Sequence, residues 1–378
     1  MPMFHDDEQA MLADTARGFV AEAAPVSHMR ALRDAGDAAG FSPALWRQFG
    51  EMGFNAILMP EANGGLGLGH VEAGIVLEEV GRNLTPSPFL GTAIGAVTAL
   101  KDGSDAQRQR WLPGIAAGET VAALAIDEGA RHRPQSIGLH AQPSGNGFRL
   151  SGAKRFVPLG HVADLLIVAA RTSGGDADAG GVTMFAVEKG AAGLSITADR
   201  LADASMAARL AFDGVEVDGD AVIGAVDDGR GTLDRVLGAV RAGAAAEMLG
   251  VGGGAMDRTV EYLRERKQFG VAIGSFQALQ HRAAHLYAEL EVARAAVLKA
   301  QQLLDDGGEG AERAVSVAKG MAGLASLLAV QEGVQMHGGI GMTDEYDIGF
   351  FMKRQRVLAE LCGDADFHAD RLARLSGY

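Results

Sequence analysis

The sequence predicts an α+β protein, mainly helical, in which a small β-domain separates two helical domains. Three observations support this prediction: helix caps and helical periods fill residues 1–120, short β-rich runs follow over residues 121–225, and long amphipathic periods occupy residues 226–378. We therefore expect an N-terminal α-helical domain, a middle β-domain and a C-terminal four-helix bundle with those boundaries. A chain of 378 residues with 48% hydrophobic composition can bury a core in each domain.

The N-terminal domain is predicted from its helix caps. Ser42 followed by Pro43 is typical of a helix start, with a capping hydroxyl and a first-turn proline. Ser104 and Gln107 have the spacing of a capping box. Between these starts, the glycine-rich residues 60–69 are expected to form a tight turn between helices; the alternative is a wall near a bound ligand.

The middle domain is predicted from runs of apolar and β-branched residues separated by turn clusters such as SGNG and TSGGDADAGG. Such a pattern favours a small sheet over helices because each run is too short for a helix. The expected strands are residues 121–126, 147–156, 163–171, 182–188 and 208–217.

The C-terminal domain is predicted from apolar positions that alternate by three and four between residues 279 and 297. Further helical runs near residues 233–264, 311–334 and 349–375 complete a four-helix set. The glycine triplet at residues 252–254 should weaken the first of these helices, unless it packs closely against a neighbour.

Composition and charge exclude several classes of protein. The formal net charge of −14 opposes a nucleic-acid groove, because phosphate-binding surfaces need clustered Lys and Arg. The single cysteine, Cys362, excludes an internal disulfide and fits a reducing compartment.

Neither a secretory signal nor a membrane span is predicted. The first residues carry acids where a secretory signal has a basic start. The most apolar stretch, near residues 241–255, contains Glu247 and glycines. We expect a cytoplasmic protein without a membrane span. His281 and His285 have no third ligand in view, so no metal site is predicted.

Two motifs in the last domain carry residues suited to holding a dinucleotide: RKQFG with FQALQ at residues 266–280, and QMHGGIG at residues 335–341. An arginine fork binds a pyrophosphate, an aromatic ring lies flat beside a nucleotide ring, and glycines let backbone amides approach phosphate. The alternative for the first motif alone is a helix C-terminus with its usual cations and glycine stop. The predicted cofactor-binding residues are Arg266, Phe269, Gln277, Gln335, Gly338 and Gly339.

In this order, and in a chain of this length, these motifs resemble the FAD-holding signature of the acyl-CoA dehydrogenase family. The resemblance extends along the chain through QRWLPGIAAGE at residues 109–119, LSGAKRFV at 150–157, ADLLIVAAR at 163–171 and FDGVEV at 212–217. It implies the acyl-CoA dehydrogenase fold, FAD as cofactor and α,β-desaturation of an acyl-CoA thioester. It also implies electron-transfer flavoprotein as the electron acceptor and an oligomer built as a dimer of dimers.

In this family a glutamate removes the proton next to the thioester carbonyl, which is general-base catalysis. Matching the common layout places Cys362 at the position of that glutamate, and the minority layout places Val240 there, just before Arg241. The usual base is therefore absent. A cysteine in a helical core more often acts as a small hydrophobic residue than as a base. Asp364 and Glu360 are weak substitutes that also fit as exposed charges at helix ends.

The β-domain also departs from the family pattern where the flavin ring is contacted. Asp127, followed by Glu128 and Gly129, stands where the family has Thr-Glu-Pro, so a hydroxyl donor is replaced by a carboxylate. Pro158 follows Val157 where the family commonly has a hydroxyl residue, and proline offers neither hydroxyl nor N–H. An anionic side chain at this position would oppose reduction of the flavin.

In the family's dimers, residues matching the two motifs reach across from one subunit to hold the adenine end of the neighbour's flavin. The leading hypothesis is therefore a subunit that lends this FAD clamp to a glutamate-bearing partner, most similar to the small subunit of pimeloyl-CoA dehydrogenase-type heteromeric enzymes. One alternative is a self-sufficient homomeric dehydrogenase or oxidase with a displaced base. The other is a structural or regulatory subunit without flavin. The sequence does not predict the acyl-chain length.

Overall fold

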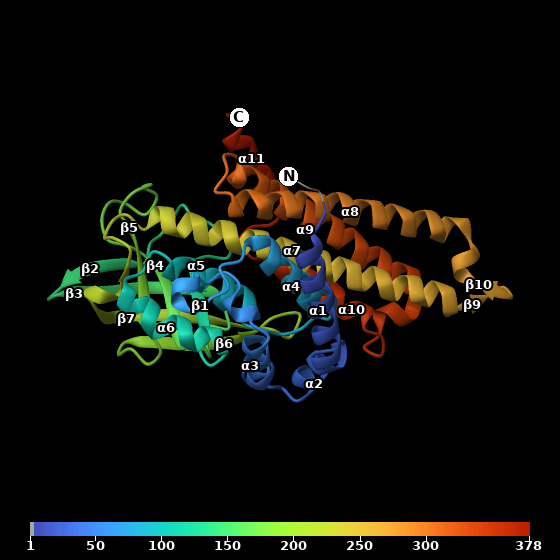
Figure 1. Ribbon diagram of the computed structural model, residues 1–378, viewed down its shortest axis with the longest axis horizontal. Helices are drawn as coiled ribbons and strands as arrows, with labels where there is room; N and C mark the ends of the chain where they lie inside the picture. The colour runs from blue at the N-terminus through green and yellow to red at the C-terminus, as the bar shows by residue number, and fades with distance from the viewer. Residues whose placement is uncertain (1–3) are drawn as a thin grey trace. The chain divides into compact units, whose positions relative to one another are not determined.

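The computed structural model describes residues 4–378 and contains the helical, β and helical segments in the predicted order (Figure 1). Of its residues, 55% are helical, and the predicted fold class is confirmed. The chain forms two compact units. Unit 1 holds the chain up to Asp34, then Gly69–Thr85 and Arg241–Tyr378, and unit 2 holds Ala35–Leu68 and Pro86–Val240.

Unit 2 contains a mainly antiparallel sheet in the order β6-β7-β3-β2-β4-β5-β8, to which β1 adds by pairing in parallel with β4. The two longest strands, β3 and β7, pair with register shifts on either side of Gly152 and Lys154, so the sheet is irregular there. The strands are β1 Ala122–Ala125, β2 His140–Ser144, β3 Gly147–Pro158, β4 Leu165–Arg171, β5 Val182–Glu188, β6 Leu194–Arg200, β7 Met206–Asp218 and β8 Val222–Ile223.

All five predicted strands exist, within one to two residues of the expected ends. Three strands of this sheet were not predicted: β2, β6 and β8. Strand β2 reads HAQPS and carries Pro143, while β6 lies at the sheet edge with mostly exposed or half-buried residues. Both therefore lack the apolar run from which buried strands are recognised.

The caps predicted for the first helical segment are present in unit 2. The Ser42 side chain accepts a hydrogen bond from the Leu45 backbone at the start of α3 (Pro43–Glu51), and Ser104 with Gln107 forms the capping box of α6 (Asp105–Ala116). The unit also has a π-helical segment, η3 (Leu90–Ala96), that continues into α5 (Val97–Leu100).

The glycine-rich loop folds back on the segment before it. The backbone amides of Leu66 and Leu68 donate to the carbonyls of Ala56 and Ile57. Ala56 closes the short 3₁₀ helix η1 (Phe54–Ala56), and a second, η2 (Glu61–Asn63), lies within the loop. This closed hydrogen-bonded turn agrees with the predicted structural role of the loop.

Unit 1 is built from long helices that run side by side (Figure 1). Helix α7 is continuous from unit 2 into unit 1, and α8 and α9 pack along each other, with α10 and α11 against α9. The helices are α1 Asp7–Ala23, α2 Val26–Asp34, α4 His70–Arg82, α7 Arg230–Glu265, α8 Gln277–Asp305, α9 Ala311–His337, α10 Ile348–Glu360 and α11 Ala365–Leu375.

The prediction of one helix over residues 349–375 was wrong, because these residues form two helices, α10 and α11. The chain leaves α10 at Cys362, which has φ +56°, and Gly363, which has φ +104°, and Asp364 then caps α11. The left-handed backbone at two successive residues cannot continue a helix.

The glycine triplet does not interrupt α7, and its close packing explains it. A Cβ atom on Gly252 would lie 2.7 Å from a methyl carbon of Leu290. On Gly254 it would lie 2.6 Å from the Arg82 carbonyl oxygen and 2.7 Å from the Phe351 ring. Larger residues are therefore excluded where α7 contacts its neighbours in unit 1.

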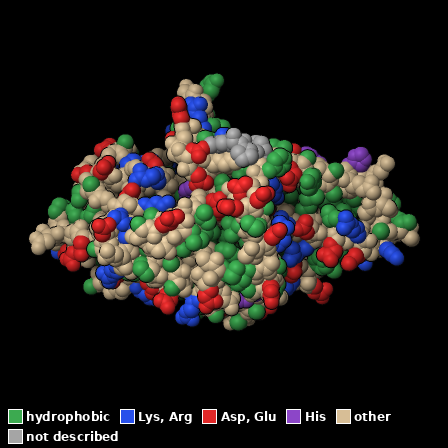
Figure 2. Space-filling view, viewed as in Figure 1, with side chains coloured by type: hydrophobic (Ala, Val, Ile, Leu, Met, Phe, Trp, Pro, Cys, Tyr) green, Lys and Arg blue, Asp and Glu red, His purple; other side chains and the backbone are tan. Residues whose placement is uncertain are grey.

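The most apolar long helix is α9 rather than the expected residues 241–255. Residues Ala311–Met342 are long and apolar enough to cross a membrane, yet 56% of the most apolar window is buried within the protein. Packing against α8, α10 and α11 accounts for this apolar character. On the face shown in Figure 2, acidic and basic side chains are interspersed.

Candidate functional site

The first predicted clamp motif forms a hairpin that joins α7 to α8. Strands β9 (Lys267–Gln268) and β10 (Val271–Ala272) pair across a two-residue turn in which Phe269 and Gly270 both have positive φ, +55° and +82°. Positive φ at both central residues is typical of a tight two-residue hairpin turn. The Phe269 side chain is 91% exposed, and its ring meets the Phe276 ring in a T-shaped arrangement at a centroid distance of 6.2 Å.

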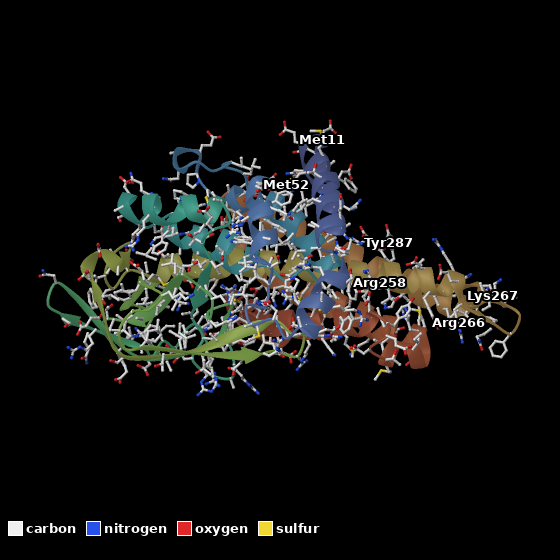
Figure 3. All side chains as sticks on the ribbon, turned by 90° about the horizontal axis from the view of Figure 1, so that it is seen from below. Met11, Met52, Arg258, Arg266, Lys267 and Tyr287 are labelled. Atoms are coloured by element: carbon white, nitrogen blue, oxygen red, sulfur yellow. The ribbon has the colours of Figure 1, made fainter. Side chains whose placement is uncertain are left out.

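Arg266 and Gln277 lie at the two ends of this hairpin segment, and both are exposed. Figure 3 shows Arg266 and Lys267 at the end of α7, with their side chains directed away from the ribbon. Within residues 4–378 no carboxylate forms an ion pair with Arg266. The guanidinium therefore keeps its donors available for an anionic ligand.

The second motif lies at the C-terminus of α9. Gly338 ends the helix with φ +66° and ψ −142°, a conformation that requires glycine, and it leads into η6 (Gly338–Met342). A Cβ atom on Gly338 or Gly339 would meet nothing within 4 Å, so open space lies in front of both residues. Gly341 differs, because a Cβ there would lie 2.7 Å from the Val334 carbonyl oxygen.

The two motifs are brought together by an aromatic cluster that sequence reasoning missed. The buried His337 ring stacks on Tyr262, one helical turn before Arg266, at a centroid distance of 4.5 Å. Tyr346 contacts both rings. His337 Nδ1 is 2.7 Å from the Gly333 carbonyl oxygen, and burial lowers the pKa of its imidazole. His337 thus has a packing role, which joins the end of α9 to the end of α7.

An ion pair fixes the start of α8 in the same region. Arg282, five residues after Gln277, pairs with Glu332, three residues before Gln335. Both glutamines therefore belong to neighbouring ends of α8 and α9. All six predicted cofactor-binding residues are exposed and lie at adjoining ends of α7, α8 and α9. An arginine, an aromatic ring, two amides and two open glycines fit the phosphate and ring groups of a dinucleotide.

The predicted base position has a different environment. Cys362 is 6% exposed, and its carbonyl oxygen accepts a hydrogen bond from Arg241 Nε at 3.1 Å. Lys319 is fully buried beside it, and Nζ donates to the carbonyls of Leu358, Ala359 and Gly363 at 3.0–3.1 Å. Burial lowers the pKa of Lys319 to about 8. The position therefore holds a thiol and a buried cation.

The weak substitutes for the base are engaged in helix ends. Asp364 Oδ1 accepts a hydrogen bond from the Phe367 backbone at 2.8 Å and so caps α11. Glu360 pairs with Arg356 on the same helix at 3.1 Å. Val240, at the position where a minority of the family carries the base, has an apolar side chain that is 2% exposed. Each contact agrees with a structural role for these residues.

In unit 2, Asp127 has a partner that the sequence reasoning missed. His132 Nδ1 lies 2.7 Å from Asp127 Oδ1, and both side chains are largely buried. The sequence contains this partner within the ARHRP segment, where His132 lies five residues after Asp127. The adjacent carboxylate, Glu128, accepts hydrogen bonds from Lys154 Nζ and from the backbone amides of Gly138 and Leu139. Burial lowers the pKa of Lys154.

Pro158 ends β3, where it is the register partner of Ala207. It contributes no donor, as proline lacks an N–H and a polar side chain. The β-domain thus offers a paired carboxylate and a proline at the two positions where hydroxyl groups were expected from the family pattern.

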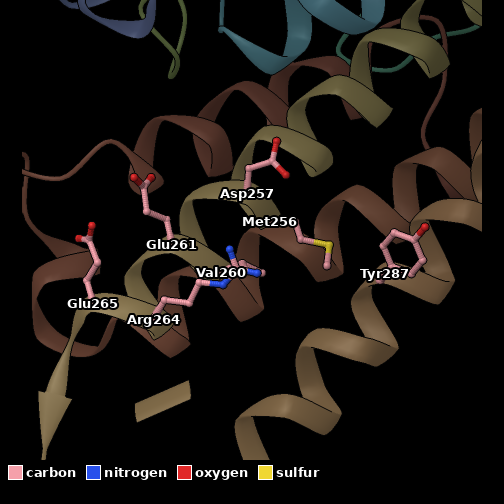
Figure 4. Close-up of a pocket in the computed structure, with 7 residues that line it drawn as sticks. All are labelled: Met256, Asp257, Val260, Glu261, Arg264, Glu265 and Tyr287. Atoms are coloured by element: carbon pink, nitrogen blue, oxygen red, sulfur yellow. The ribbon is translucent and has the colours of Figure 1, made fainter. Parts of the chain in front are cut away.

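A groove of about 600 Å³ lies between α7 and α8, and none of the six predicted cofactor-binding residues lines it (Figure 4). Its acidic side chains come from successive turns of α7 and repel phosphate groups, so the groove does not suit a dinucleotide. It is lined by Met256, Asp257, Val260, Glu261, Arg264, Glu265 and Tyr287.

Known protein families match this chain in three consecutive segments. The family models for the acyl-CoA dehydrogenase N-terminal, middle and C-terminal domains match residues 6–119, 126–215 and 227–376. The acyl-CoA dehydrogenase FadE12 of Mycobacterium tuberculosis is 33% identical over 319 residues, which covers 83% of this chain and 82% of that protein.

Two solved structures with similar folds have names that join two proteins, and one of them is named as a complex. A chain of the Tcur3481–Tcur3483 steroid ACAD superposes with a TM-score of 0.87 and 32% identity over 98% of both chains. A chain of the ChsE4–ChsE5 complex from Mycobacterium tuberculosis gives a TM-score of 0.90 and 26% identity over 100% of both chains. This chain therefore belongs to the acyl-CoA dehydrogenase family of FAD-dependent oxidoreductases.

Proposed function

We propose that this chain is the clamp-lending subunit of a heteromeric acyl-CoA dehydrogenase, which desaturates an acyl-CoA thioester at its α and β carbons. A partner subunit with a glutamate base supplies proton abstraction and the contacts to the flavin ring. This chain supplies Arg266, Phe269 and Gln277, with Gln335, Gly338 and Gly339, to the partner's FAD. The observation that carries the proposal is this outward-facing set on a chain without a carboxylate at residue 362 or 240.

The clamp side of the proposal is supported by preorganisation. The stack of His337 on Tyr262 and the Arg282–Glu332 ion pair hold the two motifs near each other before any ligand binds. A preorganised site spends less free energy on ordering side chains when it binds. FAD, when bound, supplies the hydride chemistry, and these residues would bind its phosphate and ring groups from outside.

The catalytic side is supported by what occupies the base position. The Cys362 thiol lies beside a lysine that donates to three carbonyls, and Asp364 and Glu360 are engaged in helix ends. Asp127 is paired with His132 in the β-domain. A chain with these contacts lacks the groups that remove the α-proton and polarise the flavin.

The assembly and its setting follow from the same proposal. We infer an oligomer, a dimer of dimers with a glutamate-bearing subunit. This chain has the FAD clamp but lacks the base, so a second kind of subunit is needed to complete each active site. One structural relative is named as a complex of two proteins and the name of another joins two proteins, which supports a heteromer. Electrons would pass to electron-transfer flavoprotein. We also infer a cytoplasmic location.

The test is the FAD content of the purified protein, measured by its visible absorption after denaturation. The lone chain is expected to carry almost no FAD, and co-expression with a glutamate-bearing family member should raise the content to about one FAD per two chains. In that complex, Arg266→Ala should weaken FAD binding at least about tenfold, since a charge-assisted hydrogen bond contributes about 1.5–3 kcal/mol. The FAD content of the purified complex should fall accordingly.

Arg264→Ala is the matched control, because Arg264 is exposed on the same helix but lines the groove of Figure 4. It should leave FAD content unchanged. One FAD per lone chain, with bleaching on addition of an acyl-CoA, would contradict the proposal and establish a complete enzyme. Unchanged FAD content in the Arg266 variant would indicate a subunit that contributes no clamp.

A further inference from the structure

A second, smaller cavity lies in unit 1 between α4, α7 and α8, and none of the six predicted cofactor-binding residues lines it. Its volume is about 140 Å³. Most of its walls are apolar and come from Ile75 of α4, Ala246 and Leu249 of α7, and Val297 and Leu298 of α8. An apolar cavity of about 150 Å³ is large enough to hold benzene. The cavity therefore has room for a compact apolar group of that size.

One wall of this cavity carries a buried amide without a hydrogen-bond partner. Gln301 of α8 is 5% exposed and lines the cavity. Within residues 4–378 its side-chain amide makes no hydrogen bond. Buried amides are normally hydrogen-bonded, because removing one from water without a partner costs free energy. The amide is therefore available to a polar group that enters the cavity.

A glycine in the middle of α4 makes room for this amide. Gly74 lies within the helix His70–Arg82, where glycine is less favourable than alanine. A Cβ atom on Gly74 would clash with Gln301 Nε2 and would lie 2.8 Å from Gln301 Cδ. Any larger residue would therefore displace the amide from its position. The chain thus carries both a buried amide and the space that the amide needs, although the amide binds nothing within the chain.

The charged groups on the cavity wall neutralise each other. Arg294 of α8 donates to both carboxylate oxygens of Glu78 of α4, and its Nε donates to Glu291. A charged ligand would bring a charge without a counter-ion into a largely apolar space, which costs free energy. The cavity therefore favours a neutral ligand with one polar group.

We propose that this cavity binds a small neutral phenol or alcohol. The apolar part of the ligand lies between α4, α7 and α8, and its hydroxyl group forms a hydrogen bond with the Gln301 amide. A hydroxyl group can donate to the amide oxygen or accept from the amide nitrogen, so it satisfies either group. Phe4 and His5 also line the cavity and are exposed, which gives a small ligand a route from solvent.

The test is titration of the full chain alone with phenol and with benzene, followed by isothermal titration calorimetry. Both probes are expected to bind with a Kd below about 1 mM, which ligands of this size can reach. Gln301→Leu removes the hydrogen bond but leaves an apolar wall, so the phenol Kd should rise about five- to tenfold relative to the benzene Kd. Gln331→Leu is the matched control, because Gln331 is exposed on α9, and should leave both values unchanged.

Two further variants test the space itself. Ala246→Leu extends a side chain from α7 into the cavity and should abolish binding of both probes. Gly74→Ala displaces the amide and should weaken phenol binding about as much as Gln301→Leu does. Circular dichroism shows whether each variant folds, and if Ala246→Leu does not fold, the Gln301 and Gly74 variants decide.

The proposal would be overturned if neither probe gave a saturable heat up to about 10 mM, a concentration well above the expected Kd. An unchanged ratio of the two Kd values in Gln301→Leu would also overturn it, because the amide would then be solvated by water only. Binding that persists in folded Ala246→Leu would place the ligand outside this cavity and contradict the assignment. Neither FAD nor a partner is needed, so the result does not depend on the proposed function.

Discussion

The clamp and the α10–α11 turn both belong to unit 1 but have opposite environments. At the clamp, Arg266 and Phe269 are exposed, and open space faces Gly338 and Gly339. At the turn, Lys319 is fully buried and all three of its hydrogen bonds go to backbone oxygens. At the turn, the buried polar group that stabilises the fold has hydrogen-bond partners within the chain. At the clamp, the polar groups proposed to bind a ligand remain accessible at the surface.

The largest difference in stability should appear at Lys319. Lys319→Met removes a buried cation and leaves three carbonyls without their donor, so the free energy of unfolding should fall by about 3–5 kcal/mol. Urea denaturation followed by circular dichroism measures this. Lys299→Met, an exposed lysine on α8, should change stability by less than about 0.5 kcal/mol. Equal effects of the two substitutions would remove the distinction between the regions.

A matched pair of glycines sharpens the comparison within the clamp motif itself. Gly341→Ala should lower the free energy of unfolding by about 1–3 kcal/mol, because its Cβ would lie 2.7 Å from the Val334 carbonyl oxygen. Gly339→Ala meets nothing within 4 Å and should be neutral in the lone chain, but should weaken FAD binding in the complex. Thermal melting of both variants is the measurement, and a reversed order would contradict the assignment.

A smaller, pH-dependent effect is expected from His368 beside the turn. Burial lowers the pKa of its imidazole to about 2, so below pH 6.5 the unfolded chain binds a proton that the folded chain does not. Stability is therefore lost as the pH falls through 6.5. Between pH 6.5 and 5.5 this loss is about 1 kcal/mol, from about 1.4 kcal/mol per pH unit.

The control for this prediction is His368→Phe, which removes the titrating group. Urea denaturation at the two pH values should show a loss about 1 kcal/mol smaller in the variant than in the wild-type chain. Identical losses would mean that other groups dominate the acid response of this region.

The smallest effect on the lone chain is expected at Arg266. Arg266→Ala should change the free energy of unfolding by less than about 0.5 kcal/mol, because the exposed guanidinium has no carboxylate partner among residues 4–378. Thermal melting of the isolated chain measures this, with Arg282→Ala as the contrasting variant, since Arg282 pairs with Glu332. A loss above about 1 kcal/mol would make Arg266 a structural residue.

Local signals were sufficient for much of the fold. The N-cap at Ser42, the capping box at Ser104 and the strand Val182–Glu188 are present where the sequence predicted them. Each depends on residues a few positions apart, whose backbone preferences act whatever the rest of the chain does. Edge strand β6 was missed because its pattern of burial is set by its neighbour β7 rather than by its own residues.

The sequence by itself determined the family, the residue types of the two clamp motifs and the absence of a carboxylate at residue 362. Only the tertiary structure decided that His337 stacks on Tyr262, that Asp127 is paired with His132, and that Lys319 holds the turn at Cys362. Two of these three contacts join elements more than 40 residues apart, and all depend on burial. Local preferences do not encode the two long-range contacts, because their free energies arise only when packing removes water and brings the partners together.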